Sequence, residues 1–331
     1  MSNRKWNIGI AILFIVFSSL LLSFLFSTLR IRELLQPILS NEASDKEPYH
    51  VVLLSQELDN PYWRSIEQGA REASTKYGMQ LAYTGPLRIN PNEQIKLLEK
   101  AIAAKADALL VQGINDPQFV DLINQAVSER IPVITIDTDE PSSRRLTYVG
   151  TNNLDAGKIM GGLVATAAGH KGQVAVLIGN EQSPNQQLRL EGFLSVIAQY
   201  PELSLVAVRS SNISRLQAAG EAEELLLQYP QLDYMVGLSA LDGIGIAEAA
   251  ERSKQSGLHI FAFDALEETL ERITSGKIKA TIVQQPYNMG YDAISLLNDY
   301  LHGETLPERH FTKITVQDGQ ALNDKIGATS P

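Results

Sequence analysis

The sequence predicts an α/β fold made of two lobes, each a parallel β-sheet flanked by helices. The chain has 331 residues, of which 44% are hydrophobic and 20% charged, and this length and composition suit two lobes. From His50 onward, short apolar runs bounded by turn residues alternate with longer stretches of helical periodicity. The expected strands are too many for one compact open sheet, so we expect two sheets, with a (β/α) barrel as the alternative.

The first 49 residues have a different character. Residues 7–29 carry no charge, and about 20 apolar residues suffice to span a bilayer as a helix. We therefore predict a cytoplasmic N-terminus at 1–6, a transmembrane signal anchor at 7–29 and a linker at 30–49. A cleaved signal peptide is the alternative, although its apolar core is shorter and we find no convincing cleavage site. Two basic residues lie on each side of the run, so charge does not set its orientation.

The first half of the soluble part alternates regularly. Its expected strands are His50–Ser55, Gln80–Tyr83, Ala108–Gln112, Pro132–Ile136 and Thr147–Val149. Its expected helices are Pro61–Tyr77, Asn92–Ala104, Pro117–Glu129 and Leu154–Ala168. Asn60 and Pro61 suit the cap and the first position of a helix, and Gly78 suits a left-handed end. The polar excursion Asp137–Asn153 around the last short strand indicates a passage to the other lobe.

The second half repeats the pattern. Its expected strands are Gln173–Ile178, Ser204–Arg209, Tyr234–Leu238, His259–Phe263, Ala280–Val283 and Thr312–Val316. Its expected helices are Gln186–Gln199, Ser214–Gln228, Leu241–Ser256, Leu266–Ser275 and Tyr287–His302.

Polar and aromatic side chains follow many of these strands. Because the carboxyl ends of parallel strands face one crevice, we expect them to surround a ligand. The candidates are Asn60, Tyr62, Trp63, Asp137, Thr138, Arg189, Ser239, Asp264 and Gln284. Carboxylates, amides and a guanidinium can hydrogen-bond a polyhydroxylated ligand, and flat aromatic rings suit the C–H faces of a sugar. The sequence leaves other roles open for these residues. Tyr62 and Trp63 are also compatible with a place in the core. Asp137 and Asp264 are compatible with capping the next helix, and Arg189 with a solvated charge on a helix.

Other classes of function find little support. The net charge is −10 without a long basic run, which argues against a nucleic-acid surface. The absence of cysteine excludes a thiolate site or a lipidated Cys, and the five histidines lack metal-ligand spacing. No nucleophile elbow, phosphate loop, dinucleotide fingerprint or calcium loop is present, so the sequence predicts neither an enzyme nor a cofactor.

Several motifs occur in the order typical of one family. They are Asn60-Pro61-Tyr62-Trp63, Ile131–Asp137, Tyr148–Asn153 with Ala156-Gly157, Arg189–Phe193, Phe261–Asp264 and Thr281–Pro286. On these motifs the region from His50 to Val316 resembles the type I periplasmic sugar-binding proteins, the ribose-binding-protein-like group. Lactose-repressor-type ligand domains share that fold.

The resemblance implies two Rossmann-like lobes joined by a three-crossing hinge that closes on a monosaccharide. It places the lobes at 50–152 with 286–310 and at 153–285 with 311–331. It also implies that Tyr62 and Trp63 stack on the ring and that Asp137 accepts from hydroxyls. Three positions depart from the ribose-binder pattern: Thr138 stands for an Arg, Ser239 for an Asn, and Ile213 for an aromatic residue. The sugar is therefore left open among pentoses, hexoses and other small polar ligands.

The predicted function is a membrane-anchored extracytoplasmic sugar receptor. With a proteinaceous anchor, the resemblance implies a sensor that works with a membrane histidine kinase. The alternative is the binding component of an ABC permease, and a sugar-converting enzyme is a further alternative. A repressor would need a basic helix-turn-helix in the first 49 residues, which are apolar and then polar-acidic.

Overall fold

The computed structural model describes residues 14, 17–30, 47–255 and 257–322. The chain divides into two units, Met1–Pro48 and Tyr49–Pro331. In the first unit residues 17–30 are helical, and the side chains of Phe17 and Phe24 are 60% and 73% exposed. Within the residues described, no helix is both long and apolar enough to cross a membrane. The rest of the predicted span, 7–13 and 15–16, lies outside the described residues, as do 1–6 and 31–46 of its flanks.

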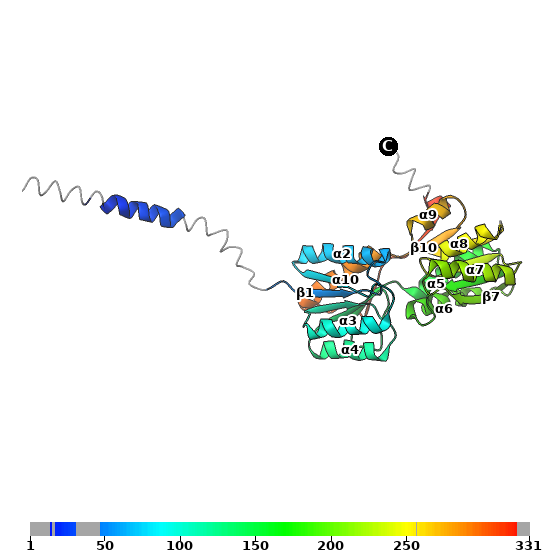
Figure 1. Ribbon diagram of the computed structural model, residues 1–331, viewed down its shortest axis with the longest axis horizontal. Coiled ribbons are helices and arrows are strands. Elements are labelled where there is room, and N and C mark those ends of the chain that lie inside the picture. Colours follow the sequence, from blue (N-terminus) through cyan, green and yellow to red (C-terminus); the bar gives the residue numbers. More distant parts are fainter. Residues whose placement is uncertain (1–13, 15–16, 31–46, 256, 323–331) are drawn as a thin grey trace, which may run out of the picture. The chain divides into compact units, whose positions relative to one another are not determined.

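The second unit contains two six-stranded sheets (Figure 1). The first has the order β11-β5-β4-β3-β1-β2, and all of its neighbours are parallel. Its strands are β1 (His50–Leu54), β2 (Gln80–Thr84), β3 (Ala108–Val111), β4 (Val133–Ile136), β5 (Thr147–Gly150) and β11 (Arg309–Phe311). In the second sheet, β12-β10-β9-β8-β6-β7, only β12 is antiparallel to its neighbour. Its strands are β6 (Gly172–Ile178), β7 (Leu203–Ser210), β8 (Tyr234–Gly237), β9 (His259–Phe263), β10 (Ala280–Val283) and β12 (Thr315–Asp318).

Helices cover both faces of each sheet, because each face carries its own apolar cluster (Figure 1). The first sheet packs against α2 (Pro61–Tyr77) and α10 (Pro286–Leu301) on one face and α3 (Pro91–Ala103) and α4 (Pro117–Ser128) on the other. The second packs against α5 (Asn153–Ala167) and α6 (Pro184–Ile197) on one face and α7 (Arg215–Gln228), α8 (Asp242–Arg252) and α9 (Glu267–Thr274) on the other. The predicted α/β fold with helix-flanked parallel sheets is thus confirmed.

The chain passes between the two sheets three times. It does so between β5 and α5, between β10 and α10, and between β11 and β12. The limits predicted for the two lobes stay a prediction, since sheet membership does not fix where a lobe ends within a connection. For brevity we call the parts built on the first and second sheets the first and second lobe.

Local sequence explains how the elements near the passages begin and end. The Asn60 side chain accepts from the backbone N–H of Tyr62 at 2.9 Å, and Pro61 opens α2, as predicted. Gly78 ends the helix with φ +68°. Helices α5 and α6 approach closely at Gly157, where a Cβ would lie 2.0 Å from the carbonyl oxygen of Arg189.

The observed elements differ from the expected ones in several places. Strand β11 was not expected, and the final strand is Thr315–Asp318 rather than Thr312–Val316. Strand β11 has only three residues and no apolar run, and its parallel pairing with β5 is long-range. Helix α6 begins at Pro184, two residues before the predicted start.

Candidate functional site

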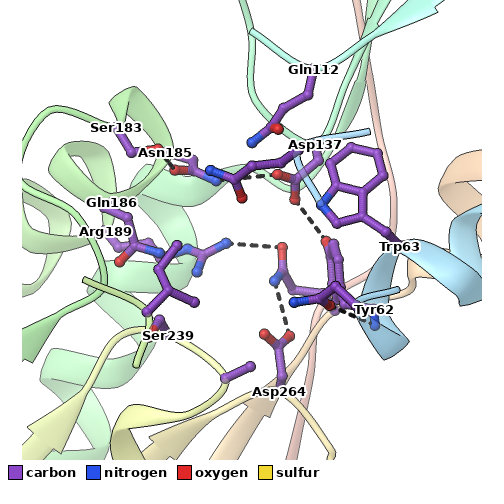
Figure 2. Close-up of a pocket in the computed structure, with 15 residues that line it drawn as sticks. Tyr62, Trp63, Gln112, Asp137, Ser183, Asn185, Gln186, Arg189, Ser239 and Asp264 are labelled. Atoms are coloured by element: carbon purple, nitrogen blue, oxygen red, sulfur yellow. Dashed lines mark hydrogen bonds between the residues drawn. The ribbon is translucent and has the colours of Figure 1, made fainter. Parts of the chain in front are cut away.

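Eight of the nine candidate residues line one pocket between the two lobes (Figure 2). They are Asn60, Tyr62, Trp63, Asp137, Arg189, Ser239, Asp264 and Gln284. The carboxyl ends of β4, β8, β9 and β10 and the N-termini of α2 and α6 supply nearly all of them. The pocket therefore lies where parallel α/β sheets place their ligands.

The two aromatic residues have different surroundings. Trp63 is 3% exposed and belongs to the core of the first lobe, yet it also lines the pocket. Most of the Trp63 ring therefore packs in the core, which was the alternative to a ligand contact, and the remainder faces the pocket. Tyr62 is half-buried, and its hydroxyl donates to Oδ1 of Asp137 at 2.8 Å. The Tyr62 ring thus orients the carboxylate beside it.

Asp137 follows β4 in a left-handed conformation, with φ +64°. Its Oδ2 accepts from the Asn185 amide at 3.4 Å, a contact between the two lobes. The Tyr148 hydroxyl donates to its carbonyl oxygen at 2.7 Å and holds the turn in place. Burial raises the pKa of Asp137, against the opposing effects of Arg189 and the Tyr62 hydroxyl.

Thr138 is the one candidate that does not line the pocket. It is fully buried behind Asp137, and its hydroxyl donates to the Asp137 carboxylate at 3.1 Å. The same hydroxyl oxygen accepts from the Gln112 amide at 3.3 Å. Thr138 thus supports the Asp137 carboxylate from behind, and a direct contact of Thr138 with a ligand stays a prediction.

Arg189 is 2% exposed, which rules out a solvated charge. Its guanidinium donates to Asn153 Oδ1 at 2.8 Å, to the Leu238 carbonyl at 2.9 Å and to Gln284 Oε1 at 3.0 Å. The guanidinium carbon also lies 3.9 Å from the centre of the Phe263 ring. These contacts hold a cation at the pocket wall.

Asp264 follows β9 with φ +67° and caps no helix, since α9 begins at Glu267 without a side-chain capping bond. Its Oδ1 accepts from Gln284 Nε2 at 2.9 Å. Burial raises the pKa of Asp264 to about 6, although the Arg189 charge and the Gln284 amide lower it. The site thus holds two buried carboxyl groups and one guanidinium.

Gln284 joins the polar groups of the second lobe to the passages between the lobes. Besides its bonds to Arg189 and Asp264, it accepts from the Thr151 hydroxyl at 2.6 Å. Thr151 lies in the passage between β5 and α5, and Gln284 in that between β10 and α10.

Two buried oxygen atoms of the pocket residues have no hydrogen-bond partner among the residues described. They are Oγ of Ser239 and Oε1 of Gln112, and both residues are at most 3% exposed. Nearly all buried polar atoms in folded proteins are hydrogen-bonded. These two oxygens are therefore free to bond a ligand.

The sequence reasoning missed several pocket residues. They are Gln56, Gln112, Ser183, Asn185, Gln186, Ile213 and Ala240, of which Ile213 had been noted only as a departure from the family pattern. Ser183-Pro184 repeats the cap-and-proline pattern of Asn60-Pro61, so the start of α6 and the pocket-facing Asn185 could have been found from it. In the described residues no group of three or more acidic or histidine side chains is placed to hold a metal ion.

Comparison with known proteins agrees with this architecture. The periplasmic binding protein domain family matches residues 51–305. The structure is similar to that of GanP, a glucose-galactose binding protein from Geobacillus stearothermophilus. The two chains are 40% identical, with a TM-score of 0.81 and coverage of 84% of this chain and 99% of that chain. It is also similar to a chain of the XylFII-LytSN complex, with 32% identity, a TM-score of 0.78 and coverage of 83% of this chain and 100% of that chain.

The ribose import binding protein RbsB of Bacillus subtilis (strain 168) is 26% identical over 80% of this chain and 85% of its own length. The chain belongs to the type I periplasmic binding protein family, as the resemblance predicted.

Proposed function

We propose that this protein is an extracytoplasmic receptor that binds a monosaccharide between its two lobes. The observation that carries the proposal is the composition of the pocket. Two buried carboxyl groups, a fixed guanidinium and two unpartnered buried oxygens offer acceptors and donors on several sides. A polyhydroxylated ring both donates and accepts, and it also presents C–H groups to Trp63. We propose Asn60, Tyr62, Trp63, Asp137, Arg189, Ser239, Asp264 and Gln284 as the residues that surround it.

The names of similar proteins support a sugar. GanP is a glucose-galactose binding protein at 40% identity, and RbsB is a ribose import binding protein at 26%. Both names describe binding proteins rather than enzymes. We infer a hexose before a pentose, because the chain that binds glucose and galactose is the more similar of the two in sequence.

We propose lobe closure as the mechanism. A ligand that contacts Asp137 in the first lobe and Arg189 or Asp264 in the second stabilises the arrangement in which both lobes touch it. Its differential affinity for that arrangement sets how far the equilibrium shifts. A membrane partner then distinguishes the two arrangements.

For the partner we propose a membrane histidine kinase. The XylFII-LytSN structure supports such a partner. In it, a chain that is 32% identical to this one forms a complex with a second protein. The alternative is an ABC permease, which the import binding proteins among the relatives favour. Purification of the full chain from its own membranes with identification of co-purifying proteins separates the two: a kinase supports the sensor, and a permease supports transport.

We further propose that residues 7–29 anchor the protein to the membrane. The described helical part, residues 17–30, exposes Phe17, Phe24 and other large apolar side chains to its surroundings. Carbonate extraction of membranes from expressing cells tests the anchor. We expect the wild type in the pellet and a Leu21→Arg, Leu22→Arg variant largely in the supernatant, because each arginine at a span centre costs about 2.5–3.5 kcal/mol. Equal release of both chains argues against the anchor.

The ligand is tested on residues 47–331. This part can be expected to fold alone, since a region of similar extent matches 99% of the GanP chain. We would measure thermal unfolding with glucose, galactose, pentoses and sugar alcohols. A ligand at 100 times its dissociation constant adds about 2.7 kcal/mol and raises the midpoint by several degrees. The response should disappear in Asp264→Asn, whereas Leu216→Gln on the surface of α7 should retain it. A flat panel would refute the sugar assignment.

A further inference from the structure

A second pocket lies beside the candidate sugar site and shares Asn185 with it. We propose that this pocket binds a small amphipathic anion, a molecule with an apolar body and one acidic group. We propose also that its occupancy changes the affinity of the neighbouring site, a part of the proposal that rests on the proposed sugar function.

The walls of the pocket are mainly apolar. The pocket has a volume of about 410 Å³, and small-molecule sites have volumes of roughly 300–1,000 Å³. Its walls include Pro141 from the first lobe, Leu188 from α6 and Phe311 from β11. The side chains of Leu188 and Phe311 are 40% and 45% exposed, although both are large and apolar. Exposed apolar side chains that gather at a concavity indicate a binding site, whereas scattered ones do not.

The charge around the pocket favours an anion. Arg309 lines it, and its ion pair with Glu308 is long, at 3.7 Å, between side chains that are 50% and 76% exposed. Such an exposed pair is weak and leaves the guanidinium available. The carboxylate of Asp139, also in the lining, is already paired with the buried Arg145. Helices α5 and α6 both begin at this pocket, and helix N-termini carry partial positive charge.

Three side chains connect this pocket to the first. Asn185 lines both pockets and donates to the Asp137 carboxylate at 3.4 Å. Tyr148 lines the second pocket, and its hydroxyl donates to the Asp137 carbonyl at 2.7 Å. Asn153 lines it as well and accepts from Arg189 Nε at 2.8 Å. A molecule that moves any of them also moves Asp137 or Arg189, and linkage makes the coupling reciprocal.

The probe is 8-anilinonaphthalene-1-sulfonate, an aromatic anion whose fluorescence reports transfer to an apolar site. It would be titrated into residues 47–331, the wild type and Leu188→Gln, Phe311→Gln and Arg309→Gln. The matched control is Leu216→Gln, the same change at a leucine that is 82% exposed on α7 and outside both pockets. Thermal midpoints and circular dichroism verify that each variant is folded.

We expect one saturable site in the wild type and in Leu216→Gln. Loss of one apolar wall residue should weaken binding about fivefold in Leu188→Gln and Phe311→Gln. Arg309→Gln should weaken binding of the dye but not of the uncharged N-phenyl-1-naphthylamine. Equal effects of Leu188→Gln and Leu216→Gln, or several dye molecules per chain without saturation, would overturn the site. Such a result would indicate an apolar surface for a protein partner instead.

The coupling is tested with the sugar that gives the largest thermal shift. At saturation we expect it to change the dissociation constant of the dye at least threefold, with the same factor for the effect of the dye on the sugar. An unchanged dye affinity would overturn the coupling. If no sugar binds, the proposed function and the coupling both fail, while the pair Leu188→Gln and Leu216→Gln still decides whether the second site exists.

Discussion

The carboxyl group of Asp264 provides a quantitative test of the site. Burial raises its pKa from 3.8 to about 6. Between these values the unfolded chain has lost a proton that the folded protein still holds, so the free energy of unfolding falls as the pH rises. Below pH 3.8 the group contributes nothing, and above about 6 its cost is constant. The difference between about 6 and 3.8, at 1.36 kcal/mol per pH unit, corresponds to about 3 kcal/mol.

The measurement is urea unfolding of residues 47–331 at several values between pH 4 and pH 8, for the wild type and Asp264→Asn. Asn tolerates the left-handed conformation as Asp does, and its amide oxygen can still accept from Gln284. Relative to the wild type, the Asn variant should gain about 2.4 kcal/mol between pH 4 and pH 7, because part of the full difference is already present at pH 4. Buried carboxyl groups without an interaction with Asp264, such as Asp242, are present in both chains and cancel, whereas Asp137 does not, because its charge contributes to the raised pKa of Asp264. Parallel pH curves for the two chains would refute the reasoning.

Ligand binding should depend on pH in the opposite direction. Sugar hydroxyls donate to the ionised carboxylate, so affinity rises as Asp264 loses its proton. With a pKa of about 6, about a tenth of the groups are ionised at pH 5, and affinity should be about tenfold lower there than at pH 7. Isothermal titration at both pH values measures the ratio. Equal affinities would show that the ligand does not prefer the ionised Asp264.

Three further predictions test packing and the polar groups. Gly157→Ala should lower the free energy of unfolding by more than about 2 kcal/mol, because its Cβ would lie 2.0 Å from the Arg189 carbonyl oxygen. On the same helix, the Cβ of the control Gly162→Ala meets nothing within 4 Å, so this substitution should raise the free energy of unfolding by about 0.5–1 kcal/mol. Equal thermal midpoints for the two variants would contradict the close packing at Gly157. Ser239→Ala removes an unpartnered hydroxyl and should leave ligand-free stability unchanged or higher while weakening sugar binding about tenfold by calorimetry; an unweakened affinity would show that Ser239 does not contact the ligand. Arg189→Lys cannot form the three bonds of the guanidinium, so binding should be lost and stability should fall by about 2 kcal/mol, whereas wild-type affinity would exclude a role in binding.

Much of the fold could be predicted from local patterns. The bounds of α2, β9 and β10 agree with the expected ones, because apolar runs and cap residues mark their ends. Strand β11 could not be predicted in this way. Its three residues have an exposed-intermediate-exposed pattern, and only the partner β5, about 160 residues earlier in the chain, makes them a strand.

The site was less predictable than the strands that carry it. Strand ends identified Asp137 and Asp264, since polar residues directly after buried strands are visible in sequence. Their left-handed conformations, and hence the directions of their carboxyl groups, depend on tertiary contacts. Thr138 shows the same limit: sequence marks its adjacency to Asp137 but not its burial behind that carboxylate.

The position of Gln284 indicates how binding would reach the passages between the lobes. Its amide holds Asp264 and Arg189 in the second lobe, and its oxygen also accepts from Thr151 in another passage. Two of the three connections between the sheets are therefore linked to the polar groups that we propose to meet the sugar. A ligand that strengthens or replaces these bonds acts on those connections directly. Under the proposed function, lobe closure then needs no separate relay, because the groups that recognise the ligand are bonded to the segments that must rotate.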